Sequence, residues 1–219
     1  GAFKVYTKWP LTSRGLKYDR EWMIVTSNGV CLTQKSNTKL CLIKPKINSI
    51  EEFLELSYPY VQPIRMSLKS NEENLNTFTS LCQSKVCGDR ILGIDCGDDI
   101  ANWLSDVLCM PDLRLIRQSS SDTRSFNNKD SKSQSSISLA NQAQFLLINA
   151  TSVDWLVRKV DNWSDVQDSE EELLCGAVDR FRGNLIIETS IPLVEKEWSS
   201  VQIGDINLLA EGLCTRCQM

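Results

Sequence analysis

Short apolar runs separated by turn-forming residues are the feature that most limits how this chain can fold. Trp22-Met23-Ile24-Val25 is one such run, and the dipeptide Asn28-Gly29 that follows is typical of tight hairpin turns. Val30 to Thr33 then supplies a return strand. Similar runs at residues 40–43, 53–57 and 64–68 are punctuated by prolines, as expected for strand edges and turns. The first part of the chain is therefore predicted to be all-β and barrel-like.

Helical spacing is convincing at only two places. Ile100, Trp103, Leu104, Val107 and Leu108 share one helical face behind Gly97, and Asp98 and Asp99 suit the first turn of that helix. The carboxylates of Asp95 and Asp98 could alternatively bind a cation, although aspartate is ordinary at a helix start. A second helix is predicted from Thr151 or Ser152 to about Val160, and Gly204-Asp205 predicts a second hairpin.

The pattern divides the chain into a small β domain at residues 1–80 and a β-barrel with helices packed outside at residues 81–219. Eight serines fall in the nineteen residues from 119 to 137, so a mobile loop is expected there. Residues 165–172 are acidic and are predicted to be solvated. The predicted fold class is mainly β, with a few α-helices.

Composition excludes several classes of function. A net charge of −4 does not favour a nucleic-acid groove, and no apolar run approaches the ~20 residues of a membrane span. No signal peptide opens the chain, so a cytoplasmic location is expected, with most of the nine cysteines reduced and packed as small apolar residues. The chain begins at Gly1 rather than Met, so we expect a fragment of a longer protein.

The only close pair of cysteines is Cys214 and Cys217, and the chain contains no histidine. This C-x-x-C spacing has three interpretations: a redox pair, half of a structural zinc site, or a thiolate that ligates a soft metal beside Arg216. A redox pair needs a βαβ context and a zinc site needs further ligands, and neither is evident. Spacing alone does not separate the three interpretations.

Two arginines flank Phe181, directly before the predicted strand Leu185 to Ile187. In strand geometry Arg180 and Arg182 point to one face, where like charges repel unless an anion lies between them. Arginine forks suit phosphate and planar polar rings, and Gly183 would let a ligand approach the backbone. The alternative is a pair of surface arginines neutralised by local acids such as Asp179.

These segments together resemble the MOSC family. The resemblance is carried in order by residues 18–25, 32–35, 40–43, 87–90, 95–97, 103–104, 180–184, 203–205 and 214–218, and it covers nearly the whole chain. Within the family, the opening Gly-Ala-Phe, residues 18–23, residues 28–32 and the closing Cys-Thr-Arg-Cys-Gln-Met are most similar to the C-terminal region of eukaryotic molybdenum cofactor sulfurases. The resemblance implies a small N-terminal β-barrel domain packed on a MOSC β-barrel.

The resemblance also implies a function. Such regions bind the molybdenum cofactor, in which a pyranopterin dithiolene ending in a phosphate holds the metal. An N-terminal desulfurase domain of the same chain carries pyridoxal phosphate and passes sulfur from L-cysteine, as a persulfide, to the cofactor. The acceptor molybdoenzymes are xanthine dehydrogenase and aldehyde oxidase. The fragment alone is expected only to bind the cofactor. The alternative is a molybdenum-dependent reductase of N-hydroxylated compounds on the same fold.

Carried over residue by residue, the resemblance makes Cys217 the molybdenum ligand and the catalytic residue. It makes Arg20 and Arg182 cofactor contacts, joined by Asn184, Thr215 and Arg216. The family has proline where this chain has Gly183, which places the backbone path at Asn184 in question.

Overall fold

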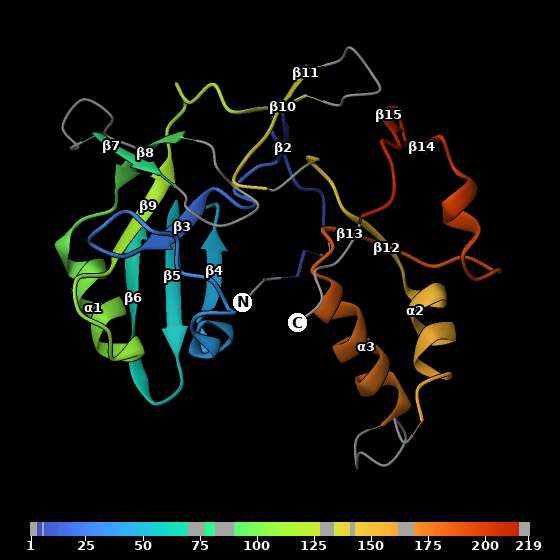
Figure 1. Cartoon of the computed structure of the whole chain (residues 1–219), viewed down its shortest axis with the longest axis horizontal. Coiled ribbons are helices and arrows are strands. Elements are labelled where there is room, and N and C mark those ends of the chain that lie inside the picture. Colours follow the sequence, from blue (N-terminus) through green and yellow to red (C-terminus); the bar gives the residue numbers. More distant parts are fainter. Residues whose placement is uncertain are drawn as a thin grey trace. The chain divides into compact units, whose positions relative to one another are not determined.

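The computed structural model describes residues 4–5, 7–69, 77–81, 90–127, 134–140, 143–161 and 169–214. The chain divides into two compact units (Figure 1). The first unit contains residues 1–127 and 133–142, and the second contains residues 128–132 and 143–219. The boundary at residue 80 that the sequence suggests stays a prediction.

Strands dominate the described part of the chain, which confirms the prediction of a mainly β fold with a few helices. They form one four-stranded sheet, one three-stranded sheet and four two-stranded pairs. Among the described residues these sheets are open, with no strand pairing that closes one into a barrel.

The first unit contains both of the larger sheets. The four-stranded antiparallel sheet has the order β3 (Trp22–Val25), β9 (Arg114–Gln118), β8 (Arg90–Asp95), β7 (Thr77–Leu81). The three-stranded sheet is a meander of β4 (Lys44–Asn48), β5 (Phe53–Tyr58) and β6 (Val61–Ser67) (Figure 1). A short hairpin of β1 (Leu11–Thr12) and β2 (Gly15–Leu16) precedes them. The strands predicted near residues 22, 53 and 64 are thus confirmed.

Helix α1 (Asp98–Leu108) provides much of the core of this unit and confirms the helix predicted there. Leu104 is 0% exposed and lies in one apolar cluster with Leu54 of β5, Leu56 of β5 and Leu115 of β9. Apolar residues at helical spacing therefore face both sheets, and this burial is what stabilises a helix of this length. Cys109 ends the helix in a left-handed conformation, with φ of 53°.

Two strands expected in this region are absent. Residues predicted as the strand 40–43 instead form the 3₁₀ helix η1 (Thr38–Leu42), because the side chain of Asn37 accepts a hydrogen bond from the Lys39 amide and starts a helical turn. Asn28-Gly29 does make a tight turn, but the predicted return strand reduces to one bridge between Val25 and Cys31. The partner of β3 is the distant strand β9, which buries Val25.

The serine-rich segment at residues 119–137, predicted to be a mobile loop, contains regular structure in its described part. β10 (Ser125–Asn127) and β11 (Gln134–Ser136) pair as antiparallel strands within it. Arg124 and Ile137 on either side of this pair are 8% and 1% exposed. Buried polar side chains that bond to backbone carbonyls hold the described parts of this segment, and its mobility stays a prediction.

The second unit is built on two parallel strands and two helices. β12 (Leu147–Asn149) pairs with β13 (Leu185–Ile187). Two helices, α2 (Ala150–Val157) and α3 (Glu170–Phe181), connect these strands along the chain and lie side by side (Figure 1). Ala150 and Val153 of α2 pack against Ala177 and Val178 of α3.

The helix limits in this unit correct the prediction. Asn149 caps α2, rather than Thr151 or Ser152, and the helix ends at Val157 rather than near 160. The acidic stretch predicted to be solvated contains the first turn of α3, where Ser169 and Glu172 form a capping box. Glutamates there complement the helix dipole, which the sequence reasoning missed.

After β13 come the 3₁₀ helix η3 (Val194–Glu197) and the antiparallel pair β14 (Ser200–Ile203) and β15 (Ile206–Leu209). This pair confirms the hairpin predicted around Gly204-Asp205. None of the helices in the described ranges combines the length and the apolar character needed to cross a membrane.

Candidate functional site

Arg20 lies at the end of a turn with an unusual backbone. Tyr18 and Arg20 have φ of 69° and 52°, the left-handed region that residues with a Cβ rarely adopt. The Asp19 amide donates to the Leu16 carbonyl at 3.0 Å and closes the turn. Such a conformation costs roughly 1–3 kcal/mol per residue and persists only where neighbouring groups hold it.

Contacts on two sides hold this turn. The Tyr18 amide donates to Oε1 of Glu21 at 2.7 Å, and the Leu139 amide donates to the Arg20 carbonyl at 2.9 Å. The Arg20 guanidinium pairs with Asp19, and its side chain is 28% exposed. The predicted cofactor contact is thus a partly exposed cation on a firmly held backbone.

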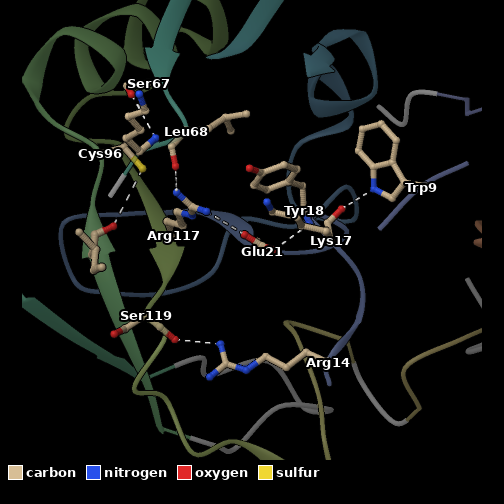
Figure 2. Close-up of polar contacts among 12 residues, drawn as sticks. Trp9, Arg14, Lys17, Tyr18, Glu21, Ser67, Leu68, Cys96, Arg117 and Ser119 are labelled. Atoms are coloured by element: carbon tan, nitrogen blue, oxygen red, sulfur yellow. Dashed lines mark hydrogen bonds and ion pairs between the residues drawn. The ribbon is translucent and has the colours of Figure 1, made fainter. Parts of the chain in front are cut away.

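Arg117 of β9 is a central contact that the sequence reasoning missed. Its Nη1 donates to the Leu68 carbonyl at 2.7 Å, and its Nη2 lies 3.2 Å from Oε2 of Glu21 (Figure 2). The guanidinium also lies over the rings of Trp22 and Tyr18, 5.0 and 5.8 Å from their centroids. An arginine next to the buried Ile116 was the available signal, since a charge in an apolar strand needs partners.

A third arginine, Arg14, fixes the serine-rich turn after β9. Its guanidinium donates to the carbonyls of Ser119, Ser120 and Asp122 at 2.9, 2.8 and 2.6 Å (Figure 2 shows the first). The buried Asp122 carboxylate accepts from the Leu92 amide and from Gln118. Backbone groups of this turn are therefore satisfied without regular secondary structure.

Arg124 orders the segment that contacts Arg20. Its Nη1 donates to the carbonyls of Ser138 and Ala140 at 2.8 and 2.6 Å, on either side of Leu139. Ile137, the residue before Ser138, is held as well, because Nε2 of Gln118 donates a hydrogen bond to its carbonyl. The amide of Leu139 is thus fixed where it meets the Arg20 carbonyl.

Cys96 lies near this cluster but is chemically inert. Burial, reinforced by the charge of Asp95, raises the pKa of the Cys96 thiol to about 12, although Arg117 acts in the opposite direction. The thiol therefore keeps its proton at neutral pH, and a protonated thiol is neither a nucleophile nor a good metal ligand.

The alternative of a cation at the start of α1 is not supported. Nε of Arg114 lies 2.6 Å from Asp95, and its Nη1 lies 2.6 Å from Asp98. These carboxylates are thus neutralised by a side chain of the same unit. Within the described ranges, no group of three or more histidine, cysteine, aspartate or glutamate residues could hold a metal ion.

In the second unit, Arg180 and Arg182 do not share a strand face as predicted. Arg180 lies in the last turn of α3, and Arg182 is the residue that ends the helix, with φ of 57° and its amide donating to the Asp179 carbonyl at 3.1 Å. The capping box at Ser169 starts a helix that continues through this segment, so the alternation argument fails. The Arg182 side chain is exposed.

Gly183 and Asn184 join the end of α3 to the sheet. A Cβ on Gly183 would lie 2.4 Å from Cγ1 of Ile148, so the missing side chain makes room for packing rather than for a ligand. Asn184 accepts from the Leu146 amide at 2.7 Å and donates to the Gln144 carbonyl at 3.0 Å. These bonds set the start of β13, and a cofactor contact by Asn184 stays a prediction.

Asn149 is a second polar residue that the sequence reasoning missed. It is 2% exposed, and its Nδ2 donates to Thr189 and to Glu195, both at 2.7 Å. Burial acts to raise the pKa of Glu195, but hydrogen bonds from Asn149 and Ser152 outweigh it and lower that pKa. This network ties the segment after β13 to the start of α2.

The predicted site residues are thus distributed over both units. Arg20 belongs to the first unit, whereas Arg182 and Asn184 belong to the second. Thr215, Arg216 and Cys217 lie outside the described residues. Cys214, the other cysteine of the terminal pair, is exposed. Convergence of these residues on one ligand stays a prediction.

Comparison with known proteins gives a consistent result along the chain. The profile of the MOSC N-terminal beta barrel domain matches residues 2–111, and that of the MOSC domain matches residues 134–219. The molybdenum cofactor sulfurases of Bombyx mori, Drosophila melanogaster and Bos taurus are 48%, 44% and 39% identical to this chain, in alignments that cover 100% of it. The chain covers 25–26% of their lengths.

A solution structure of a Bordetella bronchiseptica protein superposes on 53% of this chain and 91% of its own length, with 15% identity and a TM-score of 0.40. That likeness is too distant to argue from. The two matched profiles account for most of the sequence, in the order that the motifs predict. The chain therefore belongs to the MOSC family, with an N-terminal β-barrel domain sequence followed by a MOSC domain sequence.

Proposed function

We propose that this chain is the C-terminal, cofactor-holding part of a molybdenum cofactor sulfurase. The observation that carries the proposal is the alignment of proteins of that name along all of this chain, at up to 48% identity. In the full-length protein, a pyridoxal-phosphate desulfurase domain takes sulfur from L-cysteine as a persulfide. This chain holds the cofactor that accepts the sulfur, for use by xanthine dehydrogenase and aldehyde oxidase.

The residues of the chain fit such a cofactor. No cluster of three metal-ligating side chains exists among the described residues, and the whole chain lacks histidine. A metal that arrives with dithiolene sulfurs needs only one further protein ligand, and a soft thiolate suits it. Cys217 supplies that thiolate, and the adjacent Arg216 favours its ionised form.

Arg20 and Arg182 complete the proposed site. A guanidinium is always charged and donates a planar fork, so it suits both a phosphate and the edge of a pterin ring. The side chain of Arg20 is partly exposed and that of Arg182 is exposed, so a ligand in solution can reach both guanidinium groups. When bound, the cofactor supplies the metal centre for sulfur exchange, and the chain supplies charge and orientation.

The test is the metal and pterin content of the purified full chain. We expect Cys217→Ser to lower bound molybdenum at least tenfold, because an alcohol is a poor ligand for a soft metal. Cys214→Ser is the matched control, since it changes a thiol three residues away and should leave the molybdenum content near that of the wild type.

Equal molybdenum content in the two variants would remove the role of Cys217. A wild-type chain that carries neither molybdenum nor pterin, after production in cells that make the cofactor, would overturn the proposed function itself.

A further inference from the structure

The left-handed turn at Tyr18 and Arg20 needs a cause. Both residues carry a Cβ, and neither position has the glycine or asparagine that usually adopts such a conformation. Backbone strain of this kind clusters where a side chain must be held in one place. The contacts around the turn show what does the holding.

Glu21 connects the turn to the sheet. One carboxylate oxygen accepts from the Tyr18 amide at 2.7 Å, and the other lies 3.2 Å from Nη2 of Arg117 (Figure 2). The Glu21 side chain is 23% exposed and the Arg117 side chain 16% exposed. Separating a charge pair that is this shielded from water costs free energy, so the two side chains stay together.

Arg117 is itself fixed from three directions. The Leu68 carbonyl binds its Nη1, Trp22 and Tyr18 lie against its guanidinium, and its backbone pairs with Trp22 across the sheet. The rigid strand β9 therefore reaches the Tyr18 amide through two side chains. The opposite side of the turn is held by Leu139, whose amide donates to the Arg20 carbonyl.

Resting on the proposed function, we propose that Arg117, acting through Glu21, is the positioning residue that fixes Arg20 for the cofactor. Arg117 does not touch the ligand in this role. Its guanidinium orients a carboxylate, the carboxylate orients the Tyr18 amide, and the resulting turn sets the direction of the Arg20 side chain.

The experiment combines two readouts on the full chain. Amide hydrogen exchange at Tyr18 and Leu139 reports the turn, and the molybdenum and pterin content reports the cofactor. We expect Arg117→Ala to lower the protection of both amides about tenfold, as loss of a charged hydrogen bond would. Bound pterin should fall with it, and Arg117→Lys, which keeps the charge, should restore part of both signals.

The matched control is Arg65→Ala. Arg65 also combines an ion pair, to Glu55 at 2.6 Å, with a position over an aromatic ring, Phe53 at 4.5 Å, but it lies on the β5–β6 hairpin. This variant should leave both amides and the pterin content unchanged. A thermal unfolding curve for each variant separates local loosening from global destabilisation.

Unchanged protection in Arg117→Ala would overturn the inference, and so would lost protection with full pterin content. A wild-type chain without pterin would instead overturn the proposed function, and the exchange data would still decide whether Arg117 fixes the turn.

Discussion

At Cys96, surroundings rather than residue type determine the chemistry of a thiol. The residue lies two positions before the first residue of α1, and a helix N-terminus ordinarily lowers a thiol pKa. Burial and the charge of Asp95 prevail and raise the pKa to about 12. A reactive sulfur atom is therefore not expected at this cysteine.

This raised pKa predicts a pH-dependent contribution to stability. The unfolded thiol releases its proton near its ordinary pKa of 9.0, whereas the folded one holds it to about 12. Between these values the unfolded state binds fewer protons, so stability is lost as the pH rises. We expect the wild type to lose about 1 kcal/mol more than Cys96→Ala between pH 8 and pH 10. Urea unfolding at the two pH values measures this, and parallel losses would contradict it.

Single residues also mark the limit of prediction from the sequence. The resemblance to a family identified Arg20 as a candidate, but nothing local indicated a left-handed backbone there. Arg117 was missed because its partners, Glu21 and Leu68, lie far from it in the sequence. A charge in an apolar strand indicates that partners exist, but a single sequence does not say which distant residues they are.

At the scale of secondary-structure elements, Gly183 at the junction between α3 and β13 has a different role from the predicted one. Gly183 was expected to admit a ligand, but the space beside it is filled by Ile148 and by the Leu146 carbonyl. The glycine lets the helix end lie against the strand. Close backbone packing is as good a reason for glycine as ligand access.

Two glycine substitutions test this role. Gly183→Ala places a Cβ 2.4 Å from Ile148, and we expect a loss of about 1–3 kcal/mol in unfolding free energy. Gly176→Ala lies within α3 with nothing within 4 Å of the added atom, and should stabilise the helix by about 0.5–1 kcal/mol. Thermal unfolding of the two variants should shift in opposite directions; a stabilising Gly183→Ala would be inconsistent with the packing role.

Elements with strong local signals were predicted well. α1 and the β14–β15 hairpin follow from apolar periodicity and from a glycine turn. α3 was missed because polar capping residues begin it, and β10 and β11 were missed because polar contacts replace apolar burial. Local patterns therefore report apolar faces better than buried polar networks.

On the scale of the whole molecule, this chain corresponds to about a quarter of the related sulfurases, 26% for that of Bombyx mori. The matched profiles are those of the MOSC N-terminal beta barrel and MOSC domains. Cofactor holding is therefore the share of the reaction that we propose for this chain, and we propose that sulfur mobilisation belongs to the rest of a full-length sulfurase.

This division predicts that the chain alone does not convert L-cysteine to alanine, even with added pyridoxal phosphate. Amino-acid analysis after incubation measures the product, with a cysteine desulfurase as the positive control. Alanine above the protein-free background would show that the chain contains its own desulfurase chemistry, contrary to the proposed division.

The turn at Tyr18 and Arg20 has a consequence for anyone who engineers this protein. Glycine at position 20 would relax the backbone and would be favoured by any search for thermostability alone. The same change would delete the guanidinium that the fold holds in place at an energetic cost. Variants chosen only for heat resistance would thus be drawn away from the residues that we propose for ligand binding.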